Sequence, residues 1–411
     1  MQYLILIIIF ISLYLSIVWL SFYLISLDKK KKDILEWPGI TICIPVYNEE
    51  DSIKKTITSV NDLDYPKDKL EIIIVNDGST DNSLNIVKKI ILELKNKNIK
   101  LVNKSNGGKS SALNLALRTS KFEYFSCVDA DSLVSKNSLK EIISNFNDET
   151  IGSVISSIKV NKPNTFYEKI QWIEYLLSIF ARKIMSDIGT LVIGHGVLSV
   201  YKKNLLKKIG GFDSNSMTED FEIAMRLKYY GFKTIIEKNA ITYTNVPNNF
   251  YNIWKQRIRW FRGFIICNWK YKNMFLNKKY SAFGLFQMPV NIIGIFLLVF
   301  GVGWIIFNLI FNLYEFVLRV YLIDNYIFNY IFSSVSLKNF LLNQDLFLVI
   351  PLLFATLITL ITIYLAHKMN SEKALYYPLS FMIYIFVYPY ITFIHWVAAI
   401  FYEVFKFKKK W

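Results

Sequence analysis

The chain has 411 residues, of which 53% are hydrophobic and 19% charged, and its formal net charge is +16. The mean hydropathy of +0.31 excludes a purely soluble protein of this size and predicts membrane segments beside a polar domain. Nucleic acid is not an expected partner, because the lysines are scattered and no nucleic-acid motif occurs. The spacings of Cys43, Cys127 and Cys267 fit neither a zinc site nor a redox pair, which predicts buried free thiols.

Residues Met1 to Leu27 form an apolar run long enough to cross a bilayer core of ~30 Å. The run lacks the basic start and the cleavage site of a signal peptide. A lysine cluster, Lys29 to Lys32, follows directly, and the positive-inside tendency then places the next domain on the cytoplasmic side. We therefore expect an N-terminal transmembrane helix over 1–27 in a multi-pass protein of the plasma membrane.

From Gly39 onward, short β-rich runs alternate with helical segments. The predicted strands are Ile40–Val46, Leu70–Asn76, Ile99–Asn103 and Tyr124–Val128, and the predicted helices are Ser52–Leu63, Leu84–Leu94 and Ser110–Ser120. This order predicts an α/β fold with a doubly wound, mostly parallel sheet. Ligands of such sheets bind at the carboxyl ends of the strands.

After Lys279 the chain becomes apolar again, with candidate spans at Phe283–Phe311, Leu346–Ala366 and Tyr376–Phe401. One entry span and three exit spans would place the basic tail outside. Either the segment with Pro389 is therefore re-entrant or a stretch such as Leu313–Phe332 also spans, and the count stays open. The expected organisation is a cytoplasmic domain over 38–265, an interfacial amphipathic segment over 266–282 and a membrane region over 283–405.

Asp129-Ala130-Asp131 follows the apolar strand that ends at Val128. Two carboxylates at a strand end can hold Mg²⁺ or Mn²⁺, which takes one or two carboxylates and completes its shell with substrate phosphate oxygens. Such an ion neutralises a diphosphate leaving group as a Lewis acid. A solvated turn is the alternative, and the place at a strand end favours metal binding.

Two further loops are candidates for binding a nucleotide. Asp77 ends the second strand, where it is placed either to accept from a base or ribose or to form a turn or helix cap. The segment Asn-Gly-Gly-Lys-Ser-Ser at 106–111 opens a helix whose amides, with Lys109, can hold a phosphate, although it lacks the spacing of a P-loop. A glycine turn with a serine cap explains this segment equally well.

Thr218-Glu219-Asp220 precedes the helical run Phe221–Lys228. An acid here can take the proton from an acceptor hydroxyl as it attacks a sugar, which is typically worth ~10²–10⁴-fold in rate. Taken alone, the segment favours the alternative of a capping pattern, with Thr218 as N-cap and acids in the first turn.

The segment Gln256-Arg257-Ile258-Arg259-Trp260 places two arginines beside a tryptophan. Arginine can clamp a diphosphate with two hydrogen bonds while an indole stacks on a sugar face. The alternative is an interfacial amphipathic helix with its arginines at the level of the lipid headgroups, and the two interpretations are compatible.

Four of these elements, taken in chain order, resemble the family 2 glycosyltransferases: Asp77, Asp129-Ala130-Asp131, Thr218-Glu219-Asp220 and Gln256-Arg257-Ile258-Arg259-Trp260. More narrowly, they resemble the processive, membrane-integrated branch of cellulose, chitin, hyaluronan and poly-N-acetylglucosamine synthases. The resemblance covers about residues 40–260. The size, the single polar domain and the segment Gln-Trp-Ile-Glu-Tyr at 171–175 are most similar to bacterial poly-N-acetylglucosamine synthases, with chitin-oligosaccharide and hyaluronan synthases next.

The resemblance implies a GT-A fold, a divalent cation and inversion at the anomeric carbon. It assigns nucleoside contacts to Asp77 and Asp129, the metal to Asp131 and the general base to Asp220. Residues of the first nucleotide-binding loop and the Gly-Lys element would complete the donor site: Pro45, Tyr47, Glu49 and Lys109. The acceptor and diphosphate end would comprise Glu219, Gln256, Arg259 and Trp260.

The expected function is metal-dependent, inverting transfer of a sugar from a UDP-sugar, UDP-N-acetylglucosamine by resemblance, to a growing extracellular polysaccharide, coupled to translocation. The expected partners are the nucleotide-sugar donor, the glycan acceptor and the lipid bilayer, with room for a small accessory membrane subunit. The alternatives are a single transfer to a lipid acceptor and a non-catalytic subunit that binds glycan or nucleotide-sugar. The presence of both Asp131 and Asp220 argues against a non-catalytic role.

Two positions depart from the family pattern. His195 precedes Gly196 where the family often has a small residue, so it lies near the expected acceptor region, as a sugar contact or, slightly favoured, a tolerated turn residue. No gating element is visible after the last apolar run, which favours the lipid-acceptor alternative.

Overall fold

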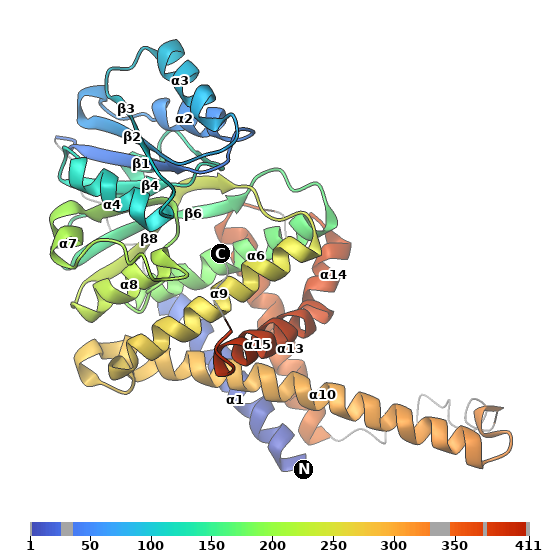
Figure 1. The fold of residues 1–411 in the computed structure, drawn as a ribbon. Helices are drawn as coiled ribbons and strands as arrows, with labels where there is room; N and C mark the ends of the chain where they lie inside the picture. The colour runs from blue at the N-terminus through green and yellow to red at the C-terminus, as the bar shows by residue number, and fades with distance from the viewer. Residues whose placement is uncertain (1, 26–35, 329–345, 373–375, 408–411) are drawn as a thin grey trace.

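A computed structural model describes residues 2–25, 36–328, 346–372 and 376–407, and it places an α/β domain on a group of apolar helices (Figure 1). The lysine cluster Lys29–Lys32 and the final lysines Lys408–Lys410 lie outside the described residues. The orientation inferred from them therefore stays a prediction.

The domain is built on an eight-stranded sheet with the order β3-β2-β1-β4-β7-β6-β8-β5. The strands are β1 Ile40–Val46, β2 Leu70–Asp77, β3 Ile99–Lys104, β4 Tyr124–Val128, β5 Ser132–Val134, β6 Ile151–Val160, β7 Val197–Lys202 and β8 Lys233–Thr244. The first four strands match the prediction and pair in parallel. In the other half, β7 runs antiparallel to β4 and β6, so the complete sheet is mixed.

Helices cover both faces of this sheet. Ile42 and Ile44 face one cluster with α2 and α3, whereas Cys43 between them faces a second cluster with α4. Burial on both faces explains why these strands are continuous apolar runs. The covering helices are α2 Ile53–Asn61, α3 Ser83–Leu94, α4 Lys109–Thr119, α5 Ser138–Ile143, α7 Lys203–Lys208 and α8 Glu219–Tyr229.

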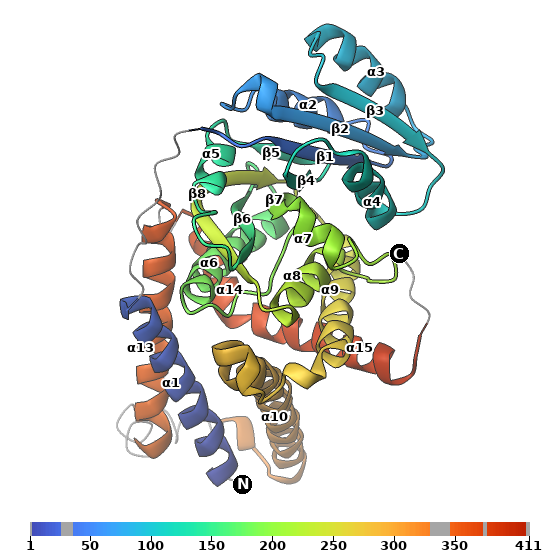
Figure 2. The ribbon, with the colours of Figure 1, turned by 90° about the vertical axis from the view of Figure 1, so that its left-hand side faces the viewer.

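Two long amphipathic helices connect the sheet to the apolar helices (Figure 2). Helix α6, Phe166–Asp187, begins with a capping box in which Thr165 and Glu168 bond each other's backbone. Helix α9, Phe250–Lys270, begins at Asn249, whose side chain accepts from the amide of Asn252. Helix α6 packs under β6 and β8, and α9 packs against α8. The predicted interfacial segment 266–282 comprises the end of α9 and short turns.

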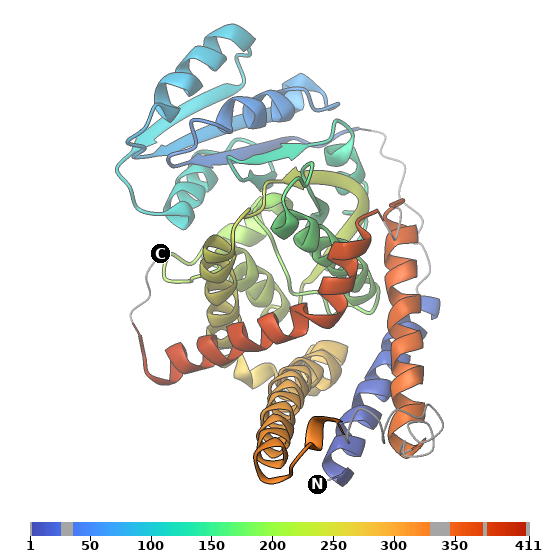
Figure 3. The same ribbon diagram turned by 90° about the vertical axis from the view of Figure 1, so that its right-hand side faces the viewer.

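Three described helices are long and apolar enough to cross a membrane, or up to four if a bent pair counts as one span. They are α1 Gln2–Ile25, α10 Met288–Leu322 with the π-helical turn before it, and α13 Leu346–Met369; the bent pair is α14 Pro378–Phe386 and α15 Tyr388–Val404. Helices α1 and α13 lie side by side (Figure 3), and α15 packs against α9.

Two predicted spans differ from the helices observed. The span predicted to end at Phe311 continues without a break to Leu322, so Leu313–Leu322 belongs to α10 and is not the start of a separate span. Residues 329–332 of that stretch lie outside the described part. The segment with Pro389 is broken at Val387, where α14 and α15 meet at a 48° bend. Proline at the start of α15 accounts for the break, because it cannot donate to the preceding turn.

The three cysteines are free and buried, which confirms the prediction. Cys43 and Cys127 face each other across β1 and β4, yet remain thiols. Burial raises the pKa of Cys127 to about 12, and burial with the nearby Glu222 charge raises the pKa of Cys267 to about 12. Thiolate, the reactive form, is therefore rare at neutral pH.

We predict that the native protein resists thiol alkylation. Maleimide at pH 7 should leave all three cysteines unmodified for hours, as followed by mass spectrometry, because they are both inaccessible and protonated. The same protein in denaturant is the control and should take up three labels. Rapid labelling of the native protein would contradict the burial of these side chains.

Candidate active site

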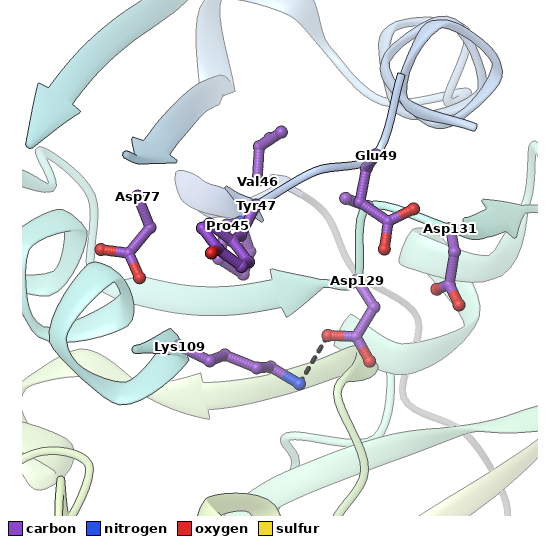
Figure 4. A pocket seen from close by; sticks show the side chains of 9 residues that line it. Pro45, Val46, Tyr47, Glu49, Asp77, Lys109, Asp129 and Asp131 are labelled. Carbon is purple, nitrogen blue, oxygen red and sulfur yellow. Dashed lines mark ion pairs between the residues drawn. The ribbon is translucent and has the colours of Figure 1, made fainter. Parts of the chain in front are cut away.

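A cavity of about 940 Å³ opens at the carboxyl ends of the first strands, where the predicted site residues converge. Loops from β2 and β4, the start of α4, the start of α8 and one face of α9 line it. The predicted residues on its wall are Tyr47, Asp77, Lys109, Asp129, Asp131, Glu219, Asp220, Gln256, Arg259 and Trp260. Pro45 and Glu49 line an adjoining pocket with five of them (Figure 4).

Asp77 is buried at the end of β2 and is already bonded. Its Oδ1 accepts from Lys104 Nζ at 2.5 Å and from the Gly107 amide at 3.0 Å. This arrangement differs from the helix cap considered for Asp77. It ties the end of β2 to the glycine turn before α4, and Gly78, at φ +73°, allows the close approach of Asn106.

The turn that carries Asp129 and Asp131 is fixed from beneath by α2. The hydroxyls of Ser52 and Thr56 donate to the Ala130 carbonyl at 3.0 and 2.7 Å. Both carboxylates are then turned toward the pocket, with Glu49 beside Asp131 (Figure 4). These hydrogen bonds fix the conformation of the turn.

These carboxylates form a donor set that suits a hard divalent cation. Burial, then the charges of Asp129 and Glu49, raise the pKa of Asp131 to about 6, so a cation here would relieve the repulsion. No group of three or more metal-ligating side chains occurs in the described parts of the chain. An ion with few protein ligands that shares its shell with phosphate fits this set, as Mg²⁺ and Mn²⁺ do.

Lys109 bridges the two acidic segments. Its ammonium lies 2.5 Å from Asp129 Oδ1 and 3.0 Å from Glu219 Oε1. Burial opposes the charged form, but Asp129 and Glu219 together hold the lysine pKa well above its usual value. The residue before it, Gly108, occupies the N-cap at φ +83°, so the serine cap considered for this helix is not formed.

The pKa values of the two acids at the start of α8 are shifted in opposite directions. Burial, then the charge of Glu219, raise the pKa of Asp220 to about 6, whereas Lys109 offsets the burial of Glu219 and lowers its pKa. Thr218 stands at the N-cap but makes no capping bond, and its buried hydroxyl has no partner in the described structure. A simple capping pattern therefore does not explain this segment.

The segment 194–196 passes between these two groups of acids. A Cβ on Gly194 would lie 2.3 Å from the Asp220 carbonyl oxygen, and one on Gly196 would lie 2.3 Å from Asp129 Oδ2. His195 between them lines the cavity, and its Nε2 donates to the Ser156 carbonyl at 2.8 Å. Burial, then the charge of Arg182, lower its pKa to about 3, so the imidazole is neutral.

Helix α9 presents Gln256, Arg259 and Trp260 to the cavity. Gln256 Oε1 is buried and has no partner within the described residues. Gly263, one turn later, lets the helix approach Thr218, because a Cβ would lie 2.4 Å from the Thr218 hydroxyl. The face predicted to bind the acceptor is therefore fixed against the segment that carries Asp220.

Sequence reasoning missed several residues that shape this cavity. Lys104 forms an ion pair with Asp77, and Gly194 lets its segment approach Asp220 closely. Arg257 contacts the ring of Trp260. The glycines on both sides of His195 are the sequence signal for this close packing, and the family pattern drew attention only to His195 and Gly196. Lys104 gave no local signal, because a lysine after a strand usually faces solvent.

Comparison with known proteins agrees with this geometry. The Glycosyl transferase family 2 model matches residues 41–210. The poly-beta-1,6-N-acetyl-D-glucosamine synthases of Staphylococcus aureus (strain MSSA476) and Staphylococcus epidermidis are 33% and 31% identical over 263 and 267 residues. Each alignment covers 62% of this chain and 63% or 64% of the relative, so a little under two thirds of each relative is spanned.

A solved structure shares the fold. The mannosyltransferase PcManGT from Pyrobaculum calidifontis, in complex with GDP-Man and Mn²⁺, superposes with a TM-score of 0.55 at 25% identity. The match covers 66% of this chain and 76% of that one. The predicted resemblance is thereby confirmed: residues 41–210 match the model of glycosyl transferase family 2, and the chain has a GT-A-type fold flanked by apolar helices.

Proposed function

We propose that this protein is a membrane-embedded, inverting hexosyltransferase that transfers N-acetylglucosamine from UDP-N-acetylglucosamine to a growing polysaccharide. One observation carries the proposal. A single cavity joins the acidic turn Asp129–Asp131 to Asp220 and Trp260, so donor diphosphate, base and acceptor can meet there. The names of the staphylococcal relatives supply the sugar and the product.

The donor would lie on the side of the cavity shown in Figure 4. Asp77 and Asp129 would contact the nucleoside, and Asp77 Oδ2 is free of the two contacts that hold Oδ1. Tyr47, about half exposed, stands at the rim of this pocket. Lys109 carries the positive charge that the diphosphate requires.

A bound Mg²⁺ or Mn²⁺ would neutralise the charge on the leaving diphosphate, and Asp131 is the residue proposed to hold it. The mannosyltransferase with 25% identity was solved with Mn²⁺, which supports the same requirement here. Asp129 remains beside it as the partner of Lys109.

Asp220 is the proposed general base. It would accept the proton of the acceptor hydroxyl while that oxygen bonds to the anomeric carbon and the bond from that carbon to the diphosphate breaks. A single displacement of this kind inverts the anomeric configuration. The raised pKa of Asp220 makes it a better proton acceptor than an ordinary aspartate, yet still ionised at neutral pH.

The acceptor would stack on Trp260, with Gln256, Arg259 and Glu219 around its reacting end. The unpartnered Gln256 Oε1 is available to a sugar hydroxyl or amide. The apolar helices lie beneath this side of the domain, which supports a product that leaves through the plasma membrane from a cytoplasmic site. Transfer of one sugar to a membrane lipid is the alternative product.

The test is UDP release by the full-length protein in lipid, with UDP- and GDP-sugars, Mg²⁺ or Mn²⁺, and sized products. We expect release with UDP-N-acetylglucosamine, a product ladder, and loss of turnover in excess chelator. Asp131→Asn and Asp220→Asn should each lower the rate by at least ~10²-fold, since a base alone contributes ~10²–10⁴-fold. Asp64→Asn removes an exposed carboxylate paired with Lys140 and should leave the rate unchanged.

Three outcomes would contradict parts of this proposal. Full activity in chelator would exclude the role of Asp131 as a metal ligand. A product of one sugar on a lipid would replace polymerisation by the lipid-acceptor alternative. Absence of release with any donor would overturn the enzymatic function.

The rate should fall as the pH drops through about 6, because Asp220 then becomes protonated and cannot accept a proton. Glu219→Gln removes the second-largest cause of that raised pKa, so the acid limb of the pH–rate profile should move to lower pH. Initial rates between pH 5 and 8 measure this. An acid limb at the same pH in both proteins would contradict the coupling of the two acids.

Gly196→Ala should lower turnover strongly, by ~10²-fold, because the added methyl would push Asp129 and Lys109 from their positions. Gly294→Ala is the matched control, since a Cβ there meets no atom within 4 Å. Initial rates at saturating donor compare the two variants. Equal activity would show that the close approach at residue 196 is not needed.

A further inference from the structure

Arg257 lies within the segment that supplies the acceptor residues, but it points away from the cavity. Its side chain is 2% exposed, and it is among the largest fully buried side chains described. A buried guanidinium destabilises a fold unless its charge is paired. A buried Arg257 therefore needs a partner that neutralises its charge.

The partner of Arg257 is a carboxylate on a different helix. Arg257 Nη2 lies 2.7 Å from Glu174 Oε2, so the ion pair joins α9 to α6. The same oxygen accepts a hydrogen bond from the Tyr388 hydroxyl at 2.8 Å. Three helices thus meet at one carboxylate oxygen, and all three side chains are at least partly buried.

Arg257 also holds the indole of Trp260. The guanidinium carbon lies 4.3 Å from the ring centroid, within the range of a cation–π contact. The two residues are three apart on α9, where side chains of a helix are neighbours. Trp260 lines the cavity on its other side, so a displaced Arg257 would free the ring that faces the acceptor.

Tyr388 connects this contact to the bent helix pair. It is the first residue of α15, directly after the break at Val387. Its hydroxyl is therefore one point at which the bend between α14 and α15 meets the domain, beside the packing of α14 on α6 and of α15 on α9. From this hydroxyl, two side chains, Glu174 and Arg257, lead to Trp260.

We propose that Tyr388, Glu174 and Arg257 are positioning residues that fix the Trp260 indole for the acceptor sugar. Through them, the placement of α15 sets how well an acceptor competes with water for the donor. The inference rests on the proposed function, in which Trp260 stacks on the acceptor. It assigns no contact with the donor to these three residues.

A purely structural ion pair is the competing explanation, and the chain supplies a matched control. Arg262 on the same helix pairs with Glu403 near the end of α15, and it also donates to the Phe407 carbonyl. This second pair joins α9 to α15 directly, whereas the first pair joins α9 to α6 and reaches α15 through Tyr388. The ring contact of Arg262 is with Tyr402, not Trp260. Loss of either pair should loosen the attachment of α9 to a neighbouring helix, and only loss of the first should affect the acceptor.

The experiment uses the full-length protein in lipid and separates two reactions of one donor. UDP release without acceptor measures hydrolysis, in which water takes the sugar and UDP leaves; release with an added N-acetylglucosamine oligosaccharide measures transfer. Glu174→Gln and Tyr388→Phe should raise the KM for the oligosaccharide by about tenfold or more, because small displacements of a binding group cause losses of this size. The KM for the donor and the rate of hydrolysis should change less than about twofold. Glu403→Gln should leave the ratio of transfer to hydrolysis unchanged.

A double variant tests whether the effect passes through the indole. Trp260→Ala should raise the acceptor KM alone, and Glu174→Gln added to it should cause no further rise, because coupled residues are not additive. Tyr388→Phe removes one hydroxyl and keeps the ring, so it tests the positioning role of the three residues even if Glu174→Gln folds poorly.

The proposal is overturned if Glu174→Gln lowers hydrolysis as much as transfer, if Glu403→Gln has the same effect on acceptor KM, or if the effects of Glu174→Gln and Trp260→Ala add. A wild-type protein that releases no UDP would instead overturn the proposed function, and with it the positioning role of Tyr388, Glu174 and Arg257.

Discussion

Lys109 is the cation that allows two acidic segments to share one cavity. Asp129 directly follows β4 and Glu219 begins α8, and unscreened repulsion between such groups in a partly buried site would push the two elements apart. One ammonium within 3.0 Å of both carboxylates removes that repulsion. Lys104, at the end of β3, neutralises Asp77 at the end of the adjacent strand β2. The geometry of this end of the cavity is therefore set by charge balance as much as by apolar packing.

Close approach at three glycines is the second constraint on the cavity. Gly194, Gly196 and Gly263 stand where a single methyl group would meet another segment at 2.3 or 2.4 Å. The atom met is the Asp220 carbonyl oxygen at Gly194, and a side-chain oxygen of Asp129 or Thr218 at the other two. Without a Cβ of their own, these glycines let the end of β4, the start of α8 and the face of α9 come together. Because these contacts join segments that are distant in the chain, the acceptor residues and the proposed base have fixed relative positions before any ligand binds.

Local patterns predicted the first half of the domain well. The bounds of β1 and β4 match because strands buried on both faces are uninterrupted apolar runs that polar residues end sharply. The second half mixes strand directions, which no local periodicity reports, and α10 is longer than the predicted span. Local pattern singled out the segments that share the cavity, and the family resemblance assigned roles to their residues and added those of the first loop, Pro45, Tyr47 and Glu49. It missed the pair Arg257–Glu174, whose members are 83 positions apart and carry no local sign of burial.

The length of α10 has a consequence for how the chain sits in lipid. The apolar helix from Phe283 to Leu322 has 40 residues and extends about 60 Å at 1.5 Å per residue, twice the ~30 Å of a hydrocarbon core. A straight helix that keeps all of this surface in hydrocarbon inclines about 60° from the bilayer normal, against an average of ~20°. Such a helix lies nearer to the plane of the bilayer than to its normal, and it displaces lipid along a broad strip beneath the domain.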